Sequence, residues 1–191
     1  MIAGVVLAAG FSRRMGRPKL LLQLQGKPVV RWAVERLLPH VEDLVVVTGQ
    51  EDAGIREALA GLAVRFVVNP APQAGQGSSI AVGVAALKPW TRAVLIALGD
   101  QPRLPDTVVP ALVEALARSG KAIVAPVYRG TQGNPVLFSA VVFAELRALT
   151  GDAGARAVVS ADPARVGRVP LDLPMPPDVD TPEDYARLHV Q

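Results

Sequence analysis

The 191-residue sequence contains no cysteine and only two histidines, His40 and His189, and aromatic residues make up 4% of it. The lack of cysteine excludes disulfides, thiolate nucleophiles and cysteine-ligated zinc or iron–sulfur sites. Two histidines are too few for a multi-histidine metal site. The scarcity of aromatic side chains argues against a surface that stacks the bases of a single nucleic-acid strand.

Long apolar segments are lacking as well. The apolar residues 1–10 have no basic residue before them, which argues against a secretory signal. No apolar run approaches the roughly 20 residues that span a bilayer. We therefore expect a cytoplasmic protein with no membrane partner.

Positive charge is concentrated near the N-terminus. The chain has 20 basic and 17 acidic residues, a net charge of +3. Residues 1–34 hold no acid and six basic residues, namely Arg13, Arg14, Arg17, Lys19, Lys27 and Arg31. The remaining 14 basic and 17 acidic residues give the rest of the chain a net charge of −3. This distribution favours a local anion site over the broad basic face of a nucleic-acid-binding protein, so we expect no nucleic-acid partner.

Short apolar runs alternate with helical periods along the chain. Runs rich in Val, Ile and Leu predict strands, buried on both faces, at 2–8, 44–48, 64–68, 93–98 and 122–127. Helices are predicted at about 27–38, 52–59, 78–87, 106–118, 139–149 and 182–189. We expect Pro28 at the first position of its helix and Thr181 as the N-cap of the last one. The six-proline stretch 163–182 predicts an extended segment or an irregular loop.

This alternation predicts an α/β fold with a Rossmann-like, doubly wound, mostly parallel sheet and helices on both faces. We expect a single domain over residues 1–191. In such folds ligands bind beyond the carboxyl ends of the strands. The polar segments that follow the predicted strands are therefore candidate sites.

The first such segment, residues 7–19, combines small residues at Ala8, Ala9 and Gly10 with four cations. Small residues let the backbone approach an anion closely, and arginine and lysine add charge. The segment lacks both the Walker A and the Gly-x-Gly-x-x-Gly patterns. It is a candidate phosphate loop, with a solvated basic loop as the alternative.

Three later segments are also candidates. In residues 69–79, two glycines and two serines offer amides and hydroxyls to a ligand, although an ordinary serine N-cap after a flexible turn explains this segment better when it is taken alone. Asp100 follows the most apolar strand, where a carboxylate suits Mg²⁺ better than it suits a simple turn. Asp178 and Asp180 share one side of an extended segment and either complete a metal site or lie at a helix cap. The polar residues 129–134 fit a hairpin-like connection.

Together these segments resemble nucleotidyltransferases of the molybdenum-cofactor type, which have a glycosyltransferase-A-type fold. The resemblance is carried, in order, by LAAG (7–10), RRMG (13–16), PKLLL (18–22), GQGSS (75–79), LGDQP (98–102), GNPVLF (133–138) and DVDTPEDY (178–185). Ala9 and Gln101 are similar to the cytidylyltransferase branch, since the guanylyltransferase branch typically has LAGG and LGDMP. One departure is Asn134, where relatives often have histidine.

The resemblance implies Mg²⁺-dependent transfer of CMP from CTP to the terminal phosphate of molybdopterin or molybdenum cofactor, with release of pyrophosphate. A molybdoenzyme or its maturation chaperone is a further expected partner. By family position, Arg14, Lys19 and Asp100 are catalytic, and Asp100 and Asp180 bind the metal. The nucleotide contacts would be Leu7, Ala8, Ala9, Gly10, Arg13, Arg14, Lys19, Gly75, Ser78, Ser79 and Asp100, and the acceptor contacts Gln101, Gly133 and Asn134.

Three alternatives remain open. A related transferase would use GTP or another phosphorylated acceptor, such as an isoprenoid precursor. A catalytically idle regulator would bind nucleotide without releasing pyrophosphate. A basic nucleic-acid-binding protein would show an affinity that falls steeply with salt.

Overall fold

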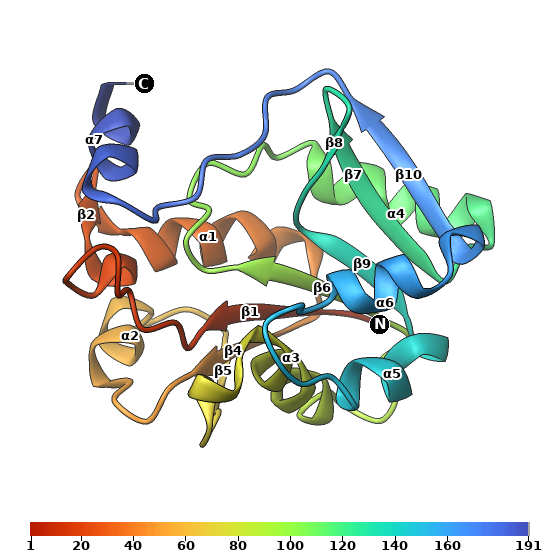
Figure 1. The fold of residues 1–191 in the computed structure, drawn as a ribbon, viewed down its shortest axis with the longest axis horizontal. Coiled ribbons are helices and arrows are strands. Elements are labelled where there is room, and N and C mark those ends of the chain that lie inside the picture. Colours follow the sequence, from red (N-terminus) through yellow and green to blue (C-terminus); the bar gives the residue numbers. More distant parts are fainter. Residues whose placement is uncertain (191) are drawn as a thin grey trace.

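The computed structural model describes residues 1–190, which form a mixed β-sheet with helices on both faces (Figure 1). Seven strands lie in the order β10-β7-β9-β6-β1-β4-β5, and the short strand β8 pairs with β7. Their bounds are β1 Ile2–Ala8, β4 Asp43–Thr48, β5 Arg65–Val68, β6 Ala93–Leu98, β7 Ile123–Tyr128, β8 Thr131–Gln132, β9 Val136–Ser139 and β10 Val166–Leu171. A separate two-stranded ribbon joins β2 Gln23–Leu24 to β3 Lys27–Pro28.

The five predicted strands are confirmed as β1, β4, β5, β6 and β7. The predicted burial on both faces is wrong for β5, which lies at the edge of the sheet and has no fully buried residue. Strand β1 lies between β4 and β6 and is parallel to both, with Leu7 opposite Val47 on one side and Leu98 on the other. Because parallel strands end at the same edge, the segments after β1, β4 and β6 emerge side by side. This edge is where the sequence predicts the site.

Five strands were not predicted, namely the two-residue strands β2, β3 and β8 and two longer strands of the main sheet. Strand β9 lies antiparallel between β6 and β7, and β10 pairs in parallel with β7 at the edge of the sheet. The sequence predicts an extended segment or an irregular loop over 163–182, and Val166–Leu171 is extended, as strand β10. Pro170 obscures this strand in the sequence, and an edge position tolerates its missing N–H.

The helices are α1 Val29–Leu37, α2 Ala53–Ala58, α3 Gln76–Ala85, α4 Val108–Ser119, α5 Phe143–Arg147, α6 Arg156–Ala161 and α7 Pro182–Val190. Short 3-10 turns occur at Lys19–Leu21, Leu38–His40, Pro72–Ala74, Ala140–Val142 and Pro163–Arg165. Pro28 precedes α1 instead of starting it, because it pairs in the β2–β3 ribbon. The predicted helix at 139–149 begins in strand β9 and then divides into a 3-10 turn and α5.

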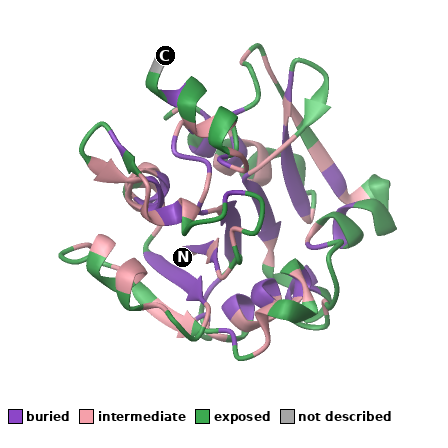
Figure 2. Ribbon diagram, turned by 60° about the vertical axis from the view of Figure 1, so that its left-hand side comes forward, coloured by how far each residue is buried: buried purple, intermediate pink, exposed green. Residues whose placement is uncertain are grey.

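Two apolar cores lie on opposite faces of the sheet, where the buried strands occupy the middle of the molecule (Figure 2). Val5 and Phe138 pack with α3, α5 and α6, whereas Val6 and Leu137 pack with α1 and α4. Successive strand residues thus point to opposite faces, and both faces are apolar. This double burial explains why the strands lack polar alternation.

A third, smaller core fixes the C-terminal helix. Met15 of the first loop, Leu24, Val29, Val179 and Leu188 pack together. Figure 1 shows the result, with α7 beside β2. Residues 178–180, the acidic segment before α7, are thereby held near the loop after β1, although more than 150 residues separate the two in the sequence. Within residues 1–190, none of the helices combines the length and apolarity that a membrane crossing requires.

Replacement of Phe138 by alanine tests the position of β9. Phe138 is fully buried, so its truncation should lower the free energy of unfolding by about 3–5 kcal/mol in urea denaturation. Val141→Ala is the control, because Val141 is 75% exposed and its loss should change stability by less than about 0.5 kcal/mol. Equal effects of the two substitutions would contradict the central placement of β9.

Candidate functional site

The loop after β1 forms a compact turn from which the side chains of Arg14 and Lys19 reach the carboxylates of the site. Ser12 has a φ of +52°, and its carbonyl accepts hydrogen bonds from Met15 N (3.0 Å) and Gly16 N (3.2 Å). Its hydroxyl accepts a bond from Lys19 N at 3.1 Å. These contacts set the start of the 3-10 turn from which the Lys19 side chain extends. The loop therefore has a definite shape before any anion binds.

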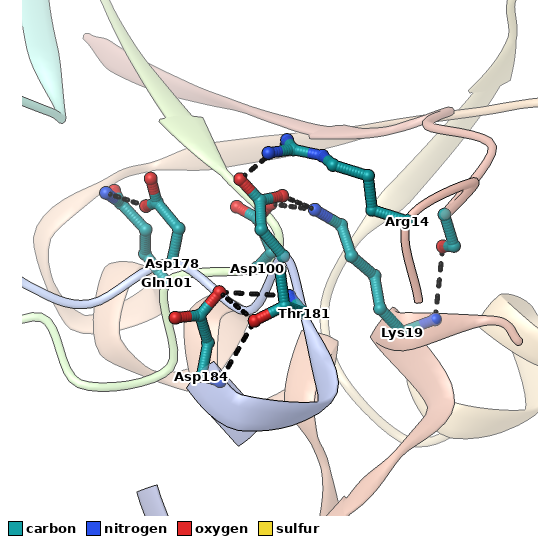
Figure 3. A network of polar contacts seen from close by, with 9 residues as sticks. Arg14, Lys19, Asp100, Gln101, Asp178, Thr181 and Asp184 are labelled. Atoms are coloured by element: carbon teal, nitrogen blue, oxygen red, sulfur yellow. Dashed lines mark hydrogen bonds and ion pairs between the residues drawn. The ribbon is translucent and has the colours of Figure 1, made fainter. Parts of the chain in front are cut away.

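Lys19 connects three distant segments of the chain. Its Nζ donates to Asp100 Oδ2 at 2.5 Å and to Asp180 Oδ1 at 2.7 Å. Arg14 donates from NH2 to Asp180 Oδ2 at 2.8 Å. Figure 3 shows the cations of the first loop approaching the carboxylates that follow β6 and precede α7. The two predicted metal ligands and two of the predicted phosphate ligands thus lie within one polar cluster.

The charges in this cluster shift one another's ionisation. Burial would lower the pKa of Lys19, but the charges and hydrogen bonds of Asp100 and Asp180 outweigh it and raise the pKa. Burial would raise the pKa of Asp180, but Lys19 and Arg14 outweigh it and lower the pKa. Both groups are therefore held charged at neutral pH.

Asp178 has a different environment. Its Oδ1 accepts a hydrogen bond from Gln101 Nε2 at 2.6 Å. Burial first, and then the charges of Asp100 and Asp180, raise the pKa of Asp178, against the opposing effects of Gln101 and Lys19. The backbone reinforces this pairing, because Val179 N donates to Asp100 O at 3.1 Å. The segment after β6 thus holds the acidic segment directly.

The geometry fits a hard divalent cation. Oδ1 of Asp100 is buried and has no hydrogen-bond partner among residues 1–190. Asp100 and Asp180 already share one cation, the Lys19 ammonium. No group of three or more acidic, histidine or cysteine side chains in the described chain forms a metal cage. The protein therefore offers two carboxylates, which is how Mg²⁺ is commonly held when phosphates supply further oxygens.

Two cavities adjoin at the carboxyl edge and share Ala9, Gly10, Phe11, Leu20 and Pro72. The larger, about 850 Å³, reaches the segments after β4 and β5. The smaller, about 400 Å³, contains the polar cluster. Of the predicted nucleotide contacts, Leu7, Arg14, Lys19, Gly75, Ser79 and Asp100 line the smaller cavity, Ala8 and Arg13 the larger, and Ala9 and Gly10 both.

The other predicted site residues lie outside both linings. Ser78 is hydrogen-bonded within its own loop, and Gln101 is 5% exposed and supports Asp178. Gly133 and Asn134 precede β9, whose antiparallel course starts at the edge where β6 ends. They therefore lie near the edge of the sheet where β6 ends, and their contact with an acceptor stays a prediction.

Asn69, which the sequence did not single out, organises the loop before α3. It is 1% exposed and donates to Ser78 Oγ at 2.9 Å and Ser79 Oγ at 3.0 Å. Its Oδ1 accepts from Ala71 N at 3.0 Å. The serine hydroxyls are therefore structural partners of Asn69, and α3 begins at Gln76 instead of at a serine cap. In the sequence, Asn69 followed by Pro70 after an apolar run indicates the start of a turn and could have pointed to this residue.

Comparison with known proteins identifies the family of this chain. Residues 4–166 match the family described as the MobA-like NTP transferase domain. The chain belongs to the MobA-like NTP transferase family. It is 32% identical to the purine catabolism protein PucB of Bacillus subtilis, over 96% of this chain and 94% of that protein. It is 34% identical to the nicotine blue oxidoreductase of Paenarthrobacter nicotinovorans, over 98% and 96%.

A solved structure supports the fold of this MobA-like chain. Rv0371c of Mycobacterium tuberculosis H37Rv superposes with a TM-score of 0.88 at 30% identity, over 100% of this chain and 98% of that one. A second structure of Rv0371c is a complex with manganese, at a TM-score of 0.85 and 29% identity. The nucleotidyltransferase fold expected from the sequence motifs is confirmed.

Replacement of Asn69 by alanine tests how the loop before α3 is held. The substitution removes two donors and one acceptor from a buried site, so the free energy of unfolding should fall by about 1–3 kcal/mol. Urea denaturation measures this loss. Gln73→Ala, an exposed change in the same loop, should stay within about 0.5 kcal/mol of the wild type. A wild-type stability for Asn69→Ala would contradict the assigned role.

Proposed function

We propose that this MobA-like transferase is a Mg²⁺-dependent cytidylyltransferase that joins CMP from CTP to the terminal phosphate of molybdopterin or molybdenum cofactor. The observation that carries the proposal is the cluster of Lys19 and Arg14 on Asp100 and Asp180, at the edge where β1 and β6 end. Cations for a triphosphate and carboxylates for its metal lie within hydrogen-bonding distance of each other. Transfer of a nucleotidyl group needs this pairing.

Asp100 and Asp180 would hold the metal, and the manganese complex of Rv0371c supports a divalent cation in this family. When bound, Mg²⁺ would neutralise charge on the α- and β-phosphates. Lys19 and Arg14 would bind the triphosphate and stabilise the departing pyrophosphate. Arg13, on the larger cavity, would assist.

The acceptor needs no general base. A terminal phosphate has a second pKa of about 6, so it is already a dianion at neutral pH. Its attack on the α-phosphate depends on in-line placement and charge neutralisation. This requirement suits two cavities whose linings contain no histidine in the described residues.

The choice of CTP and of the molybdopterin acceptor rests on the motifs around Ala9 and Gln101. The nucleoside would lie in the larger cavity, between the first loop and the segments after β4 and β5. The name of the Paenarthrobacter relative raises a redox activity as another possibility. The sequence has no Gly-x-Gly-x-x-Gly dinucleotide pattern to favour it.

Asp100→Asn tests the proposed reaction. Pyrophosphate release is measured with molybdopterin and each of CTP, GTP, ATP and UTP, in the presence of Mg²⁺. The wild type should prefer CTP, and Asp100→Asn should lose at least about 100-fold in rate while the fold is retained. Asp106→Asn, a change of an exposed aspartate, should keep the wild-type rate. Full turnover by Asp100→Asn would contradict the metal assignment, and a preference for GTP would contradict the cytidylyl assignment.

Lys19→Met tests whether the lysine and the metal compete for the same carboxylates. The Lys19 ammonium contacts both Asp100 and Asp180, the proposed metal ligands. Its removal should strengthen Mn²⁺ binding by at least about 10-fold, as measured by electron paramagnetic resonance titration, and should weaken CTP binding. Lys27→Met, a change outside the cluster, should alter neither. Weaker Mn²⁺ binding in Lys19→Met would show that the carboxylates do not form the metal site.

A further inference from the structure

Helix α7 follows directly on one of the two proposed metal ligands, because only Thr181 lies between Asp180 and the first residue of the helix. Thr181 Oγ1 accepts a hydrogen bond from Asp184 N at 3.2 Å, which makes Thr181 the N-cap. Asp184 Oδ2 in turn accepts from Thr181 N and from Thr181 Oγ1, both at 2.9 Å (Figure 3). This reciprocal capping stiffens the start of α7. The position of Asp180 therefore follows the position of the helix.

The other end of α7 is bound to the segment after β6. Arg103 NH2 donates to Leu188 O at 2.9 Å. A carbonyl in the last turn of a helix lacks a partner within the helix and lies at the negative end of the helix dipole, so a guanidinium suits it. Arg103 follows Asp100 by three residues. It thus joins the segment that carries one proposed metal ligand to the helix that follows the other.

Other contacts hold α7 against the loop after β1 and the β2–β3 ribbon. Leu188 packs in the third core with Met15, and the Tyr185 hydroxyl donates to Gln23 O at 2.5 Å. The Arg17 guanidinium lies 5.7 Å from the centroid of the Tyr185 ring. Helix α7 is therefore held both by the loop that supplies the cations of the site and by the segment after β6.

Stability alone does not explain an arginine at position 103. Arg103 Nε is buried and has no hydrogen-bond partner among residues 1–190. A buried donor without a partner destabilises a protein, and an unbranched apolar side chain of similar length would avoid this cost. What the guanidinium adds is a directed bond to a helix carbonyl. The arrangement thus favours a role in orienting α7.

We propose that Arg103 is a positioning residue, which sets the placement of Asp180 relative to Asp100 by holding the last turn of α7. Next to the carboxylates, Val179 N donates to Asp100 O at 3.1 Å. Arg103 joins the same two parts of the chain at the other end of the helix, so the two bonds together restrict the tilt of α7. Carboxylates held at a fixed separation bind a metal more tightly than mobile ones. The inference rests on the proposed function for the metal-binding role of the two aspartates.

Arg103→Met tests this inference, with Arg103→Lys as the conservative variant. Mn²⁺ binding without nucleotide, measured by electron paramagnetic resonance titration, should weaken about 10-fold in Arg103→Met. Arg103→Lys should return to within about threefold of the wild type, because an ammonium can still donate to the Leu188 carbonyl. Lys121→Met is the matched control. It removes another bond from a cation to a backbone carbonyl, that of Lys121 Nζ to Ala164 O, and should leave Mn²⁺ affinity unchanged.

A second readout does not depend on the metal. The Val179 amide is hydrogen-bonded to Asp100 O, so a looser α7 should expose it to solvent more often. In Arg103→Met, amide hydrogen exchange followed by nuclear magnetic resonance should be at least about 5-fold faster at Val179. Exchange at Val6, a fully buried residue of β1, should stay at the wild-type rate.

An unchanged Mn²⁺ affinity in Arg103→Met, or an equal loss in Arg103→Lys, would overturn the inference. Faster exchange at Val6 as well as at Val179 would also overturn it, because Arg103 would then only stabilise the fold. Failure of the proposed function has a separate signature, since a wild type that binds no Mn²⁺ would refute the metal site itself. The exchange rate at Val179 would still decide in that case whether Arg103 positions the acidic segment.

Discussion

The placement of the Lys19 ammonium between Asp100 and Asp180 is the contact on which the site depends. Four carboxylates, at positions 100, 152, 178 and 180, line one small cavity, and without a cation they would repel one another. Lys19 and Arg14 neutralise this charge in the protein alone. Under the proposed function, a metal would take the place of Lys19 on the carboxylates and a triphosphate would take the place of the carboxylates on Lys19 and Arg14.

The fold serves this cluster by bringing three sequence-distant segments to one edge. Parallel pairing of β1 with β6 places the first loop beside Asp100. The small core of Met15, Leu24, Val29, Val179 and Leu188 holds the segment before α7 against that loop. The start of α3 and the turn before it are joined by backbone hydrogen bonds to the loop at 150–154, which also lines the cavity. The sheet, which packs against an apolar core on each face, thus supports loops whose positions are set by a few specific contacts.

Local patterns identified much of this architecture. The five apolar runs predicted β1, β4, β5, β6 and β7, because a strand in a sheet that is covered on both faces has a continuous apolar composition. Strand β9 escaped prediction because four residues beside a polar turn have no periodicity of their own, and β10 escaped because Pro170 resembles a loop signal. Both strands are stabilised by pairing with β7, which is a long-range interaction.

The sequence by itself determined the kinds of residue at the site and the edge at which they would meet. Small residues, cations and acids follow apolar strands in the chain, and parallel strands must end together. Only the tertiary structure decided which of them touch. The contact of Lys19 with Asp180 spans 161 positions, the roles of Asn69 and Gln101 are to support other side chains, and Asp152 enters the cavity from a loop with no strand before it. Such contacts depend on how helices pack across the sheet, and no local period or propensity encodes that packing.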